Sequence, residues 1–446
     1  MGKGKGRVAI VTLGCKVNQF ESDAIAEALE QEGWEVVTFA PGVDLTIINT
    51  CVVTARAEAE ARRWIHRARR VNPEGLLLVA GCYPQIDPEG VISLGPDGVA
   101  GNQEKESIVE IVEKMLQGRR PVVRVGDIWK AKSPPALQTA HFRNHTRAFL
   151  KIQDGCNARC SYCIVPLARG RSRSVPVSQV LASVRKLAAV GYREVVLSGI
   201  HLGLYGQDLV PKTSLLELLR QIEDEQPPSR IRLSSLEPQE VTPELIDFIS
   251  TSQRICPHLH LPLQSASDEI LRRMDRPYTG EFFRELIFQI YERVSDVAIG
   301  VDVMVGFPGE DERAFQRTYD LLHVLPISYL HVFPFSPRPG TRAAEMPQQV
   351  QAQKKKERVK ALRALSREKR TAFYSRYIGK TLTLLLEHRR QGGMLRGLSR
   401  NYIFCLLEGG DELMGQEVEV MLLGVNGERG LGKMVANGAG CSPKRA

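Results

Sequence analysis

The chain has 446 residues, of which 43% are hydrophobic and 25% charged, a composition that excludes a disordered protein and a length that predicts two to four domains. No apolar run approaches the 18 residues of a membrane span, so we expect no membrane partner, and nine cysteines in so long a chain exclude a disulfide scaffold and suit a cytoplasmic protein. The formal net charge of +9 favours a polyanionic partner.

Residues 5–118 alternate strand and helix signals. Strand-like runs at 8–12, 45–48 and 76–79 are separated by helical patterns, and a last helical stretch covers 104–116. Alternating strands and helices predict a doubly wound, parallel α/β sheet.

One cysteine follows each of these three strands. Cys15, Cys51 and Cys82 each lie just past the carboxyl end of a strand, the edge at which open α/β sheets bind ligands. The three could therefore meet in one crevice, although buried cysteines are also common core residues.

Residues 119–141 interrupt this pattern. The run Ser133-Pro134-Pro135 and the polar run from His141 to His145 predict a linker between two domains.

A second group of cysteines lies in one short stretch. Cys156, Cys160 and Cys163 are spaced by four and three residues, after a predicted strand at 148–153. Structural zinc needs four ligands and no fourth Cys or His lies nearby, and the spacing is not that of a tandem ferredoxin. Three local thiolates can hold three irons of a [4Fe–4S] cluster and leave the fourth iron open. The loop resembles the signature of the radical S-adenosylmethionine enzymes.

Residues 142–372 predict a second α/β domain. Six strands alternate with helices, which suggests the partial (β/α)6 barrel that the resemblance also implies. Strand ends supply the site in such barrels. As S-adenosylmethionine contacts, or as structural turns and caps, we single out Ser198, Gly199, Ser234, Ser235, Glu237 and Gln264.

The C-terminal part changes character. Residues 350–372 predict a charged helix, either with a solvated face or with a basic surface for RNA. In residues 374–440 short strands and Gly-rich turns predict a small antiparallel β-barrel that resembles the TRAM domain, an OB-like RNA-binding module. Arg400 and Tyr402 are expected on its exposed surface.

The whole chain resembles the methylthiotransferases. The sequences around Cys15, Cys51 and Cys82 are similar to the N-terminal domain of that family, in which such cysteines ligate a second [4Fe–4S] cluster. The motif Thr12-Leu-Gly-Cys-Lys-Val-Asn-Gln resembles the subgroup that acts on N6-threonylcarbamoyladenosine, rather than the isopentenyladenosine or ribosomal-protein subgroups.

This resemblance implies a function. We expect methylthiolation at C2 of N6-L-threonylcarbamoyladenosine 37 in the anticodon stem-loop of tRNA. It would use two [4Fe–4S] clusters, S-adenosyl-L-methionine and a low-potential flavodoxin- or ferredoxin-like electron donor; no sulfur donor is identified. The alternatives are methylthiolation of isopentenyladenosine or of a ribosomal protein aspartate and, in a different class, a non-catalytic iron–sulfur RNA-binding protein.

Overall fold

The N-terminal region forms a six-stranded parallel sheet. The computed structural model describes residues 5–143, 145–225, 228 and 230–435, and in it the strand order is β2-β1-β3-β4-β5-β6. Strands β3 and β4 are buried along their whole length because helices cover both faces. The strands are β1 (Gly6–Thr12), β2 (Trp34–Val36), β3 (Leu45–Thr50), β4 (Leu76–Gly81), β5 (Gly98–Ala100) and β6 (Val122–Arg124). The helices are α1 (Lys16–Gln31), α2 (Ala55–Val71), α3 (Cys82–Ile86), α4 (Pro88–Ile92), η1 (Gln103–Ser107), α5 (Ile108–Leu116) and η2 (Ile128–Lys130).

The middle region is an open barrel of six parallel strands. Two three-stranded sheets, β7-β10-β11 and β12-β13-β14, are joined by a bridge between Ile231 and Ile255, so the barrel is open between β7 and β14. The six strands are β7 (Ala148–Lys151), β10 (Glu194–Ser198), β11 (Arg230–Leu233), β12 (His258–Gln264), β13 (Ala298–Val305) and β14 (Tyr329–Pro334). The short ribbon β8 (Gln153–Asp154) and β9 (Arg173–Ser174) flanks the cysteine loop.

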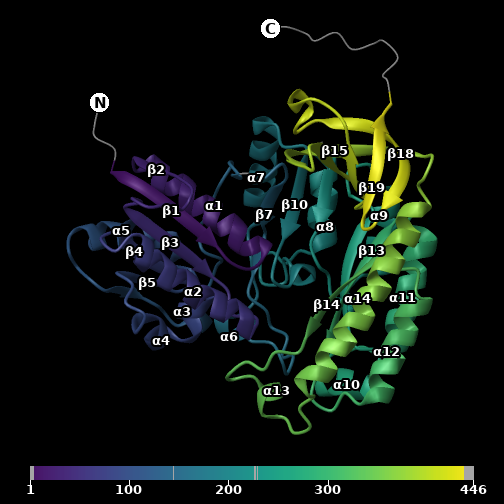
Figure 1. Cartoon of the computed structure of the whole chain (residues 1–446), viewed down its shortest axis with the longest axis horizontal. Helices are drawn as coiled ribbons and strands as arrows, with labels where there is room; N and C mark the ends of the chain where they lie inside the picture. Colours follow the sequence, from purple (N-terminus) through teal and green to yellow (C-terminus); the bar gives the residue numbers. More distant parts are fainter. Residues whose placement is uncertain (1–4, 144, 226–227, 229, 436–446) are drawn as a thin grey trace.

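Helices cover the outside of this barrel, with the N-terminal sheet on the side of β7 (Figure 1). Their apolar faces meet the strands in one large core that includes Leu187, Leu219, Ile287 and Leu362. The helices are α6 (Val165–Arg169), α7 (Val177–Val190), η3 (Leu202–Leu204), α8 (Leu215–Asp224), η4 (Pro238–Glu240), α9 (Pro243–Thr251), α10 (Asp268–Arg273), α11 (Gly280–Arg293), α12 (Glu312–Val324), α13 (Arg342–Glu345) and α14 (Ala352–Ser375).

The C-terminal region is a closed five-stranded barrel in the order β15-β16-β17-β19-β18. All of its strand pairs are antiparallel except β17 and β19, which run parallel. Residues 436–440 of the expected TRAM domain lie outside the described residues. The elements are β15 (Thr381–Gln391), β16 (Met394–Ser399), β17 (Phe404–Leu407), η5 (Asp411–Leu413), β18 (Glu417–Asn426) and β19 (Arg429–Met434). The multidomain α/β fold predicted from the sequence is confirmed.

Two local expectations are wrong. The stretch 119–141 is not only a linker, because β6 pairs with β5 and becomes the edge strand of the N-terminal sheet. Nor does the C-terminal barrel present Tyr402 to solvent: its ring stacks on His258 of β12, with the ring centroids 4.1 Å apart. Arg400 donates to the carbonyl oxygens of Gln253 and Ile255. Both side chains dock the barrel onto the middle region, because an aromatic ring and a guanidinium can serve a domain interface as well as RNA.

No helix among the described residues is both long enough and apolar enough to cross a membrane.

Candidate functional site

The first cysteine triad lies at one edge of the N-terminal sheet. Cys15, Cys51 and Cys82 follow β1, β3 and β4, which are neighbours in the sheet. Cys51 and Cys82 are buried and Cys15 is exposed. Burial, with Cys82 and Cys15 close by, raises the pKa of the Cys51 thiol to about 12. Gly14 lets the strands approach, since a Cβ there would lie 2.7 Å from the Cβ of Cys51.

Asparagine side chains hold the loops of this triad. The amide nitrogen of Asn18 donates to the carbonyl oxygens of Leu13 (2.7 Å) and Thr50 (2.9 Å), which ties together the loops that carry Cys15 and Cys51. Asn102 donates to the sulfur of Cys82 at 3.5 Å and to the carbonyl oxygen of Ala168, in α6 of the middle region, at 2.7 Å. The triad is therefore fixed against the neighbouring barrel.

The second triad lines a cavity of about 480 Å³ at the end of β7 and β8. The backbone N–H of Ala158 donates to the sulfur of Cys156 at 3.4 Å, and Nδ1 of His201 lies 3.1 Å from the same sulfur. Arg276 donates through Nη1 to the sulfur of Cys160 at 3.4 Å. Burial and the neighbouring cysteines raise the pKa of the Cys163 thiol to about 12. N–H donors and a cation around thiolates stabilise the extra charge of a reduced iron–sulfur cluster.

Neither triad has the spacing of a mononuclear metal site. Among the described residues, the groups of three or more Cys, His, Asp or Glu whose ligand atoms all lie within 4.8 Å of one another include neither triad. Sulfur atoms further apart than this do not fit the ligand sphere of a single tetrahedral ion, whereas the irons at the corners of a cluster can accommodate them.

Two of the predicted cofactor contacts have buried polar atoms without partners. Ser234 Oγ and Gln264 Oε1 are buried and have no hydrogen-bond partner. Gln264 also has a φ of +64°, in the left-handed region that a side chain other than glycine seldom adopts. Buried polar atoms are usually paired, so these two fit a bound polar ligand.

The other four predicted cofactor contacts, Ser198, Gly199, Ser235 and Glu237, differ in their burial and in their neighbours. A Cβ at Gly199 would lie 2.9 Å from Oε1 of Gln153, so the backbone passes close to that amide. Glu237 binds Arg276, with 2.8 Å between Oε2 and Nη2. Ser198 is buried, whereas Ser235 is exposed. The structure thus links Glu237 to Cys160 of the cysteine loop through Arg276, which also contacts the carbonyl oxygen of Pro262 at 3.5 Å.

Sequence reasoning missed His201 and Arg276. His201 bonds through Nε2 to Glu240 Oε1 at 2.5 Å, and both this carboxylate and the Cys156 thiol raise its pKa to about 10 against the opposing effect of burial. Arg276 follows α10, far from the cysteine loop in sequence. The one sequence signal for His201 is its place just after the predicted turn at Ser198-Gly199.

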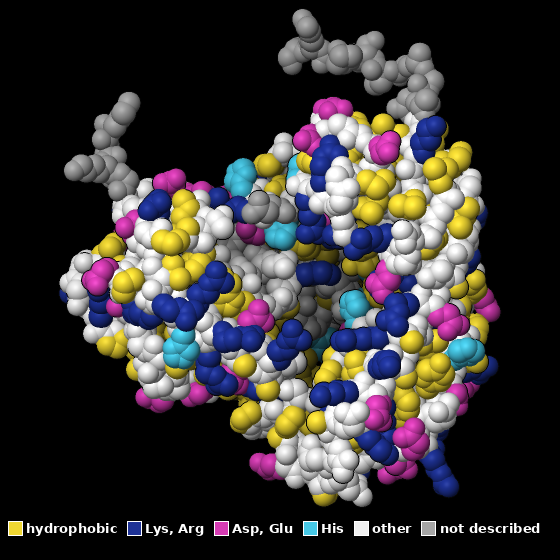
Figure 2. All heavy atoms as spheres, viewed as in Figure 1, with side chains coloured by type: hydrophobic (Ala, Val, Ile, Leu, Met, Phe, Trp, Pro, Cys, Tyr) yellow, Lys and Arg dark blue, Asp and Glu magenta, His cyan; other side chains and the backbone are white. Residues whose placement is uncertain are grey.

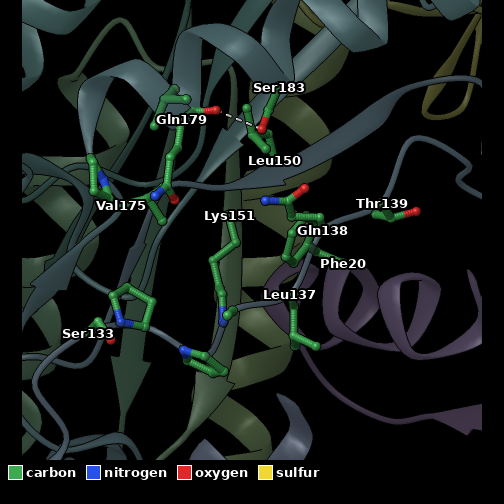
Figure 3. Close-up of a pocket in the computed structure, with 15 residues that line it drawn as sticks. Phe20, Ser133, Leu137, Gln138, Thr139, Leu150, Lys151, Val175, Gln179 and Ser183 are labelled. Carbon is green, nitrogen blue, oxygen red and sulfur yellow. Dashed lines mark hydrogen bonds between the residues drawn. The ribbon is translucent and has the colours of Figure 1, made fainter. Parts of the chain in front are cut away.

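A buried cluster of charges joins the two regions. Arg169 of α6 donates to Glu21 and to Asn18 of α1, at 2.9 and 2.6 Å, and to Asp154 at 3.0 Å. Lys151 runs past the segment 133–139 and α7 (Figure 3), and its ammonium reaches Glu21 at 2.9 Å. Asn18 borders the first triad, and the N–H of Cys156 donates to the carbonyl oxygen of Gly170. One buried network therefore links the supports of both triads.

Comparison with known proteins agrees with this geometry. Residues 7–101 match the family described as "Uncharacterized protein family UPF0004", and residues 150–322 match the radical SAM superfamily. The radical S-adenosylmethionine methyltransferase TsrM from Kitasatospora setae, solved with cobalamin and a [4Fe-4S] cluster bound, has a similar fold. Its TM-score is 0.57 at 18% identity, over 77% of each chain. The fold and the cysteine loop thus define a radical S-adenosylmethionine enzyme, a class that works with S-adenosylmethionine and an iron–sulfur cluster.

Curated relatives match over nearly the full length. The threonylcarbamoyladenosine tRNA methylthiotransferase MtaB of Aquifex aeolicus is 40% identical over 93% of this chain and 100% of its own. MtaB of Bacillus subtilis is 38% identical over 93% of each chain. The tRNA-2-methylthio-N(6)-dimethylallyladenosine synthase of Pelotomaculum thermopropionicum is 33% identical over 93% of this chain and 94% of its own. The chain belongs to the radical S-adenosylmethionine methylthiotransferase family, of the MtaB type.

Proposed function

We propose that this protein methylthiolates C2 of N6-L-threonylcarbamoyladenosine at position 37 of tRNA. The observation that carries the proposal is the match to relatives named for this substrate, 40% identical over 93% of the chain, together with two cysteine triads in one molecule. A reaction on tRNA belongs in the cytoplasm, and the cluster chemistry needs a flavodoxin- or ferredoxin-like electron donor.

The two triads would hold two [4Fe–4S] clusters. The second triad, Cys156, Cys160 and Cys163, would hold the cluster that binds S-adenosylmethionine, and the first triad, of residues 15, 51 and 82, would hold the other. When bound, the clusters and S-adenosylmethionine supply an adenosyl radical, a sulfur atom and a methyl group. An adenine C2–H is too weak an acid for a side-chain base to deprotonate, which is why the reaction calls for this chemistry.

The side chains of the chain position these groups. Arg276 and His201 contact the sulfurs of the second triad, and the unpartnered oxygens of Ser234 and Gln264 are available to S-adenosylmethionine. Ser198, Gly199 and the remaining predicted residues stay candidate contacts. The buried network around Arg169 would hold the two clusters at a fixed separation, so that the target base can lie between them.

A competition between two RNA substrates tests the proposal. The reconstituted enzyme, with S-adenosylmethionine and a reductant, is given equal amounts of two anticodon stem-loops, one with threonylcarbamoyladenosine and one with isopentenyladenosine. We expect the threonylcarbamoyl substrate to be methylthiolated preferentially, as measured by mass spectrometry of the nucleosides. A preference for the isopentenyl substrate would overturn the substrate assignment in favour of the function named for the Pelotomaculum relative. Modification of neither, with S-adenosylmethionine cleaved, would overturn the function on tRNA.

A further inference from the structure

The excess positive charge of the protein is concentrated in two helices. Helix α14 carries nine Lys and Arg against two Glu, and α2 carries six Arg against two Glu. Together they hold a formal charge of +11, more than the +9 of the whole chain. A charge distribution this uneven is typical of a surface that binds a polyanion.

These two helices border the same groove. A cavity of about 770 Å³ is lined on one side by α14 and the end of β14, and on the other by Thr54 and Arg56, at the start of α2. The N–H of Ala55 donates to Ser336 Oγ at 3.0 Å, which joins the two sides of the groove. Figure 2 shows Lys and Arg side chains on both sides of the hollow in this face of the molecule. Thr54, which lines the groove, is three residues along the chain from Cys51, so this end of the groove lies close to the loop that carries Cys51.

Four of the five cations of α14 that line the groove form one stripe. Lys356, Lys360, Arg363 and Arg367 recur at intervals of four, three and four residues and are all exposed. None of the four has an ion-pair partner among the residues that the structure describes. The neighbouring Arg358, which points away from the groove, is instead buried against Glu310 at 3.0 Å. The stripe therefore has its charges free for an external anion.

The facing helix repeats the pattern. Arg56, Arg63 and Arg70 of α2 recur every seven residues, which places them on one helix face, and all three are exposed. The opposite face of α2 carries the buried Ala61 and Ile65. Arg56 lines the groove itself, opposite the stripe of α14, and Arg63 and Arg70 continue its row along the exposed face of α2. Cations thus stand on both sides of the groove, as contact with the phosphates of a nucleic acid stem requires.

The C-terminal barrel lacks this charge. Between residues 381 and 434, six Lys and Arg stand against seven Asp and Glu. Its arginines are largely engaged: Arg390 pairs with Asp411 at 2.7 Å, and Arg396 with Glu387 at 2.9 Å. The barrel can contact RNA through other groups, but it does not supply a field that attracts phosphates.

We infer that the cationic stripe of α14 and the facing arginines of α2 hold the phosphate backbone of the anticodon stem of tRNA. This inference rests on the proposed function and locates its substrate. With the stem held along the groove, the anticodon loop lies next to the Cys51 loop, where its target base can be turned out of the stack. The phosphate contacts fix the orientation of the RNA, and the base is read elsewhere.

The test compares two variants that lose equal charge. The first combines Lys356→Ala, Lys360→Ala and Arg363→Ala. The control combines Lys212→Ala, Arg272→Ala and Arg313→Ala, three exposed cations that do not line the groove. Binding of full-length tRNA that carries threonylcarbamoyladenosine is measured between about 50 and 200 mM salt, a range over which phosphate contacts change affinity strongly.

We expect the groove variant to bind tRNA at least about tenfold more weakly than the wild type. Its slope of log K against log salt should become shallower by about two to three, because three phosphate contacts are lost and each contributes about 0.7 to 0.9. The control should stay within about twofold. Both should keep their iron and cleave S-adenosylmethionine at the wild-type rate, which shows that they are folded. Equal affinities for both variants would overturn the inference. A wild-type enzyme that binds tRNA with no salt dependence would also overturn it, whereas a wild-type enzyme that does not bind tRNA would overturn the proposed function instead.

Discussion

Arg169 of α6 and Glu21 of α1 form a fully buried ion pair across the contact between the N-terminal sheet and the open barrel, with 2.9 Å between Nη1 and Oε1. Lys105 and Lys151 also reach Glu21, and Asp154 is the other carboxylate of the cluster. Three cations thus share two carboxylates away from water. The cations around it hold the pKa of Glu21 well below its usual range, against the opposing effect of burial.

Glu21→Gln should destabilise the protein strongly. Removal of one partner from a buried pair leaves uncompensated charge and costs about 3–5 kcal/mol. The matched control is Glu30→Gln on the same helix, where the partner Arg143 and the carboxylate are both partly exposed, so that at most about 1 kcal/mol is at stake. Urea unfolding of the anaerobic protein measures both. Equal losses from the two substitutions would contradict the view that the buried cluster locks the regions together.

The sequence predicts this site unevenly. Cys156, Cys160 and Cys163 are visible because a cluster loop is a local pattern, and Cys15 and Cys51 because parallel strands end at a common edge. Their role as ligands stays a prediction. His201 and Arg276 were missed because each meets its cysteine only through tertiary packing.

The fold, too, is predicted from the sequence where the signal is local and is missed where tertiary packing decides. The alternation of strands and helices predicts both α/β regions, but three-residue strands such as β6 give no periodic signal. Tyr402 was assigned to an RNA-binding surface. An aromatic residue close to an arginine in a loop suits RNA binding and a contact between domains equally well, so the sequence alone does not distinguish the two roles. Only the position of His258 distinguishes the two.

A pH-dependent contribution to stability is expected from Asp23. Burial raises the pKa of this carboxyl to about 7, although the N–H of Arg143 donates to it at 3.3 Å. A carboxyl whose pKa is raised in the folded state stabilises the protein fully below its unfolded pKa, near 4, and this contribution is lost as the pH rises through 7. The wild type should therefore lose up to about 4 kcal/mol between pH 4 and pH 8 from this group, since the pKa is raised by about three units and each unit corresponds to about 1.4 kcal/mol.

Asp23→Asn should remove that component and make the protein more stable than the wild type at pH 8, because the amide oxygen can still accept from Arg143. Unfolding free energies measured from pH 5 to pH 8 check this. The control is Asp224→Asn, at an exposed position of α8, which should leave the pH profile unchanged. A profile of Asp23→Asn that is parallel to the wild type would show that the group is ionised throughout.

Iron content tests whether the two triads act separately. Two [4Fe–4S] clusters would give about eight irons per reconstituted chain, and changing Cys156, Cys160 and Cys163 together to Ala should leave about four. That variant should lose S-adenosylmethionine cleavage. Cys51→Ala should keep the cleavage and lose methylthiolation, because Cys51 lies in the other triad. Cys405→Ala, in the C-terminal barrel, is the control and should keep all its iron. Loss of all the iron from the triple variant would mean one cluster shared by both triads.

Arg276 should raise the reduction potential of the cluster at the second triad. Its Nη1 donates to the sulfur of Cys160, and its positive charge lies beside the thiols of the second triad. A cation at this position stabilises the additional negative charge of a reduced cluster. Arg276→Met removes a donor and a positive charge together, and both losses disfavour reduction. We therefore expect a more negative potential in a redox titration followed by electron paramagnetic resonance, without S-adenosylmethionine. Arg272→Met is the matched control, because this exposed residue of α10 does not line the cavity of the cysteine loop. An unchanged potential in Arg276→Met, with the iron content intact, would show that Arg276 serves only to pair Glu237 and to support the loop.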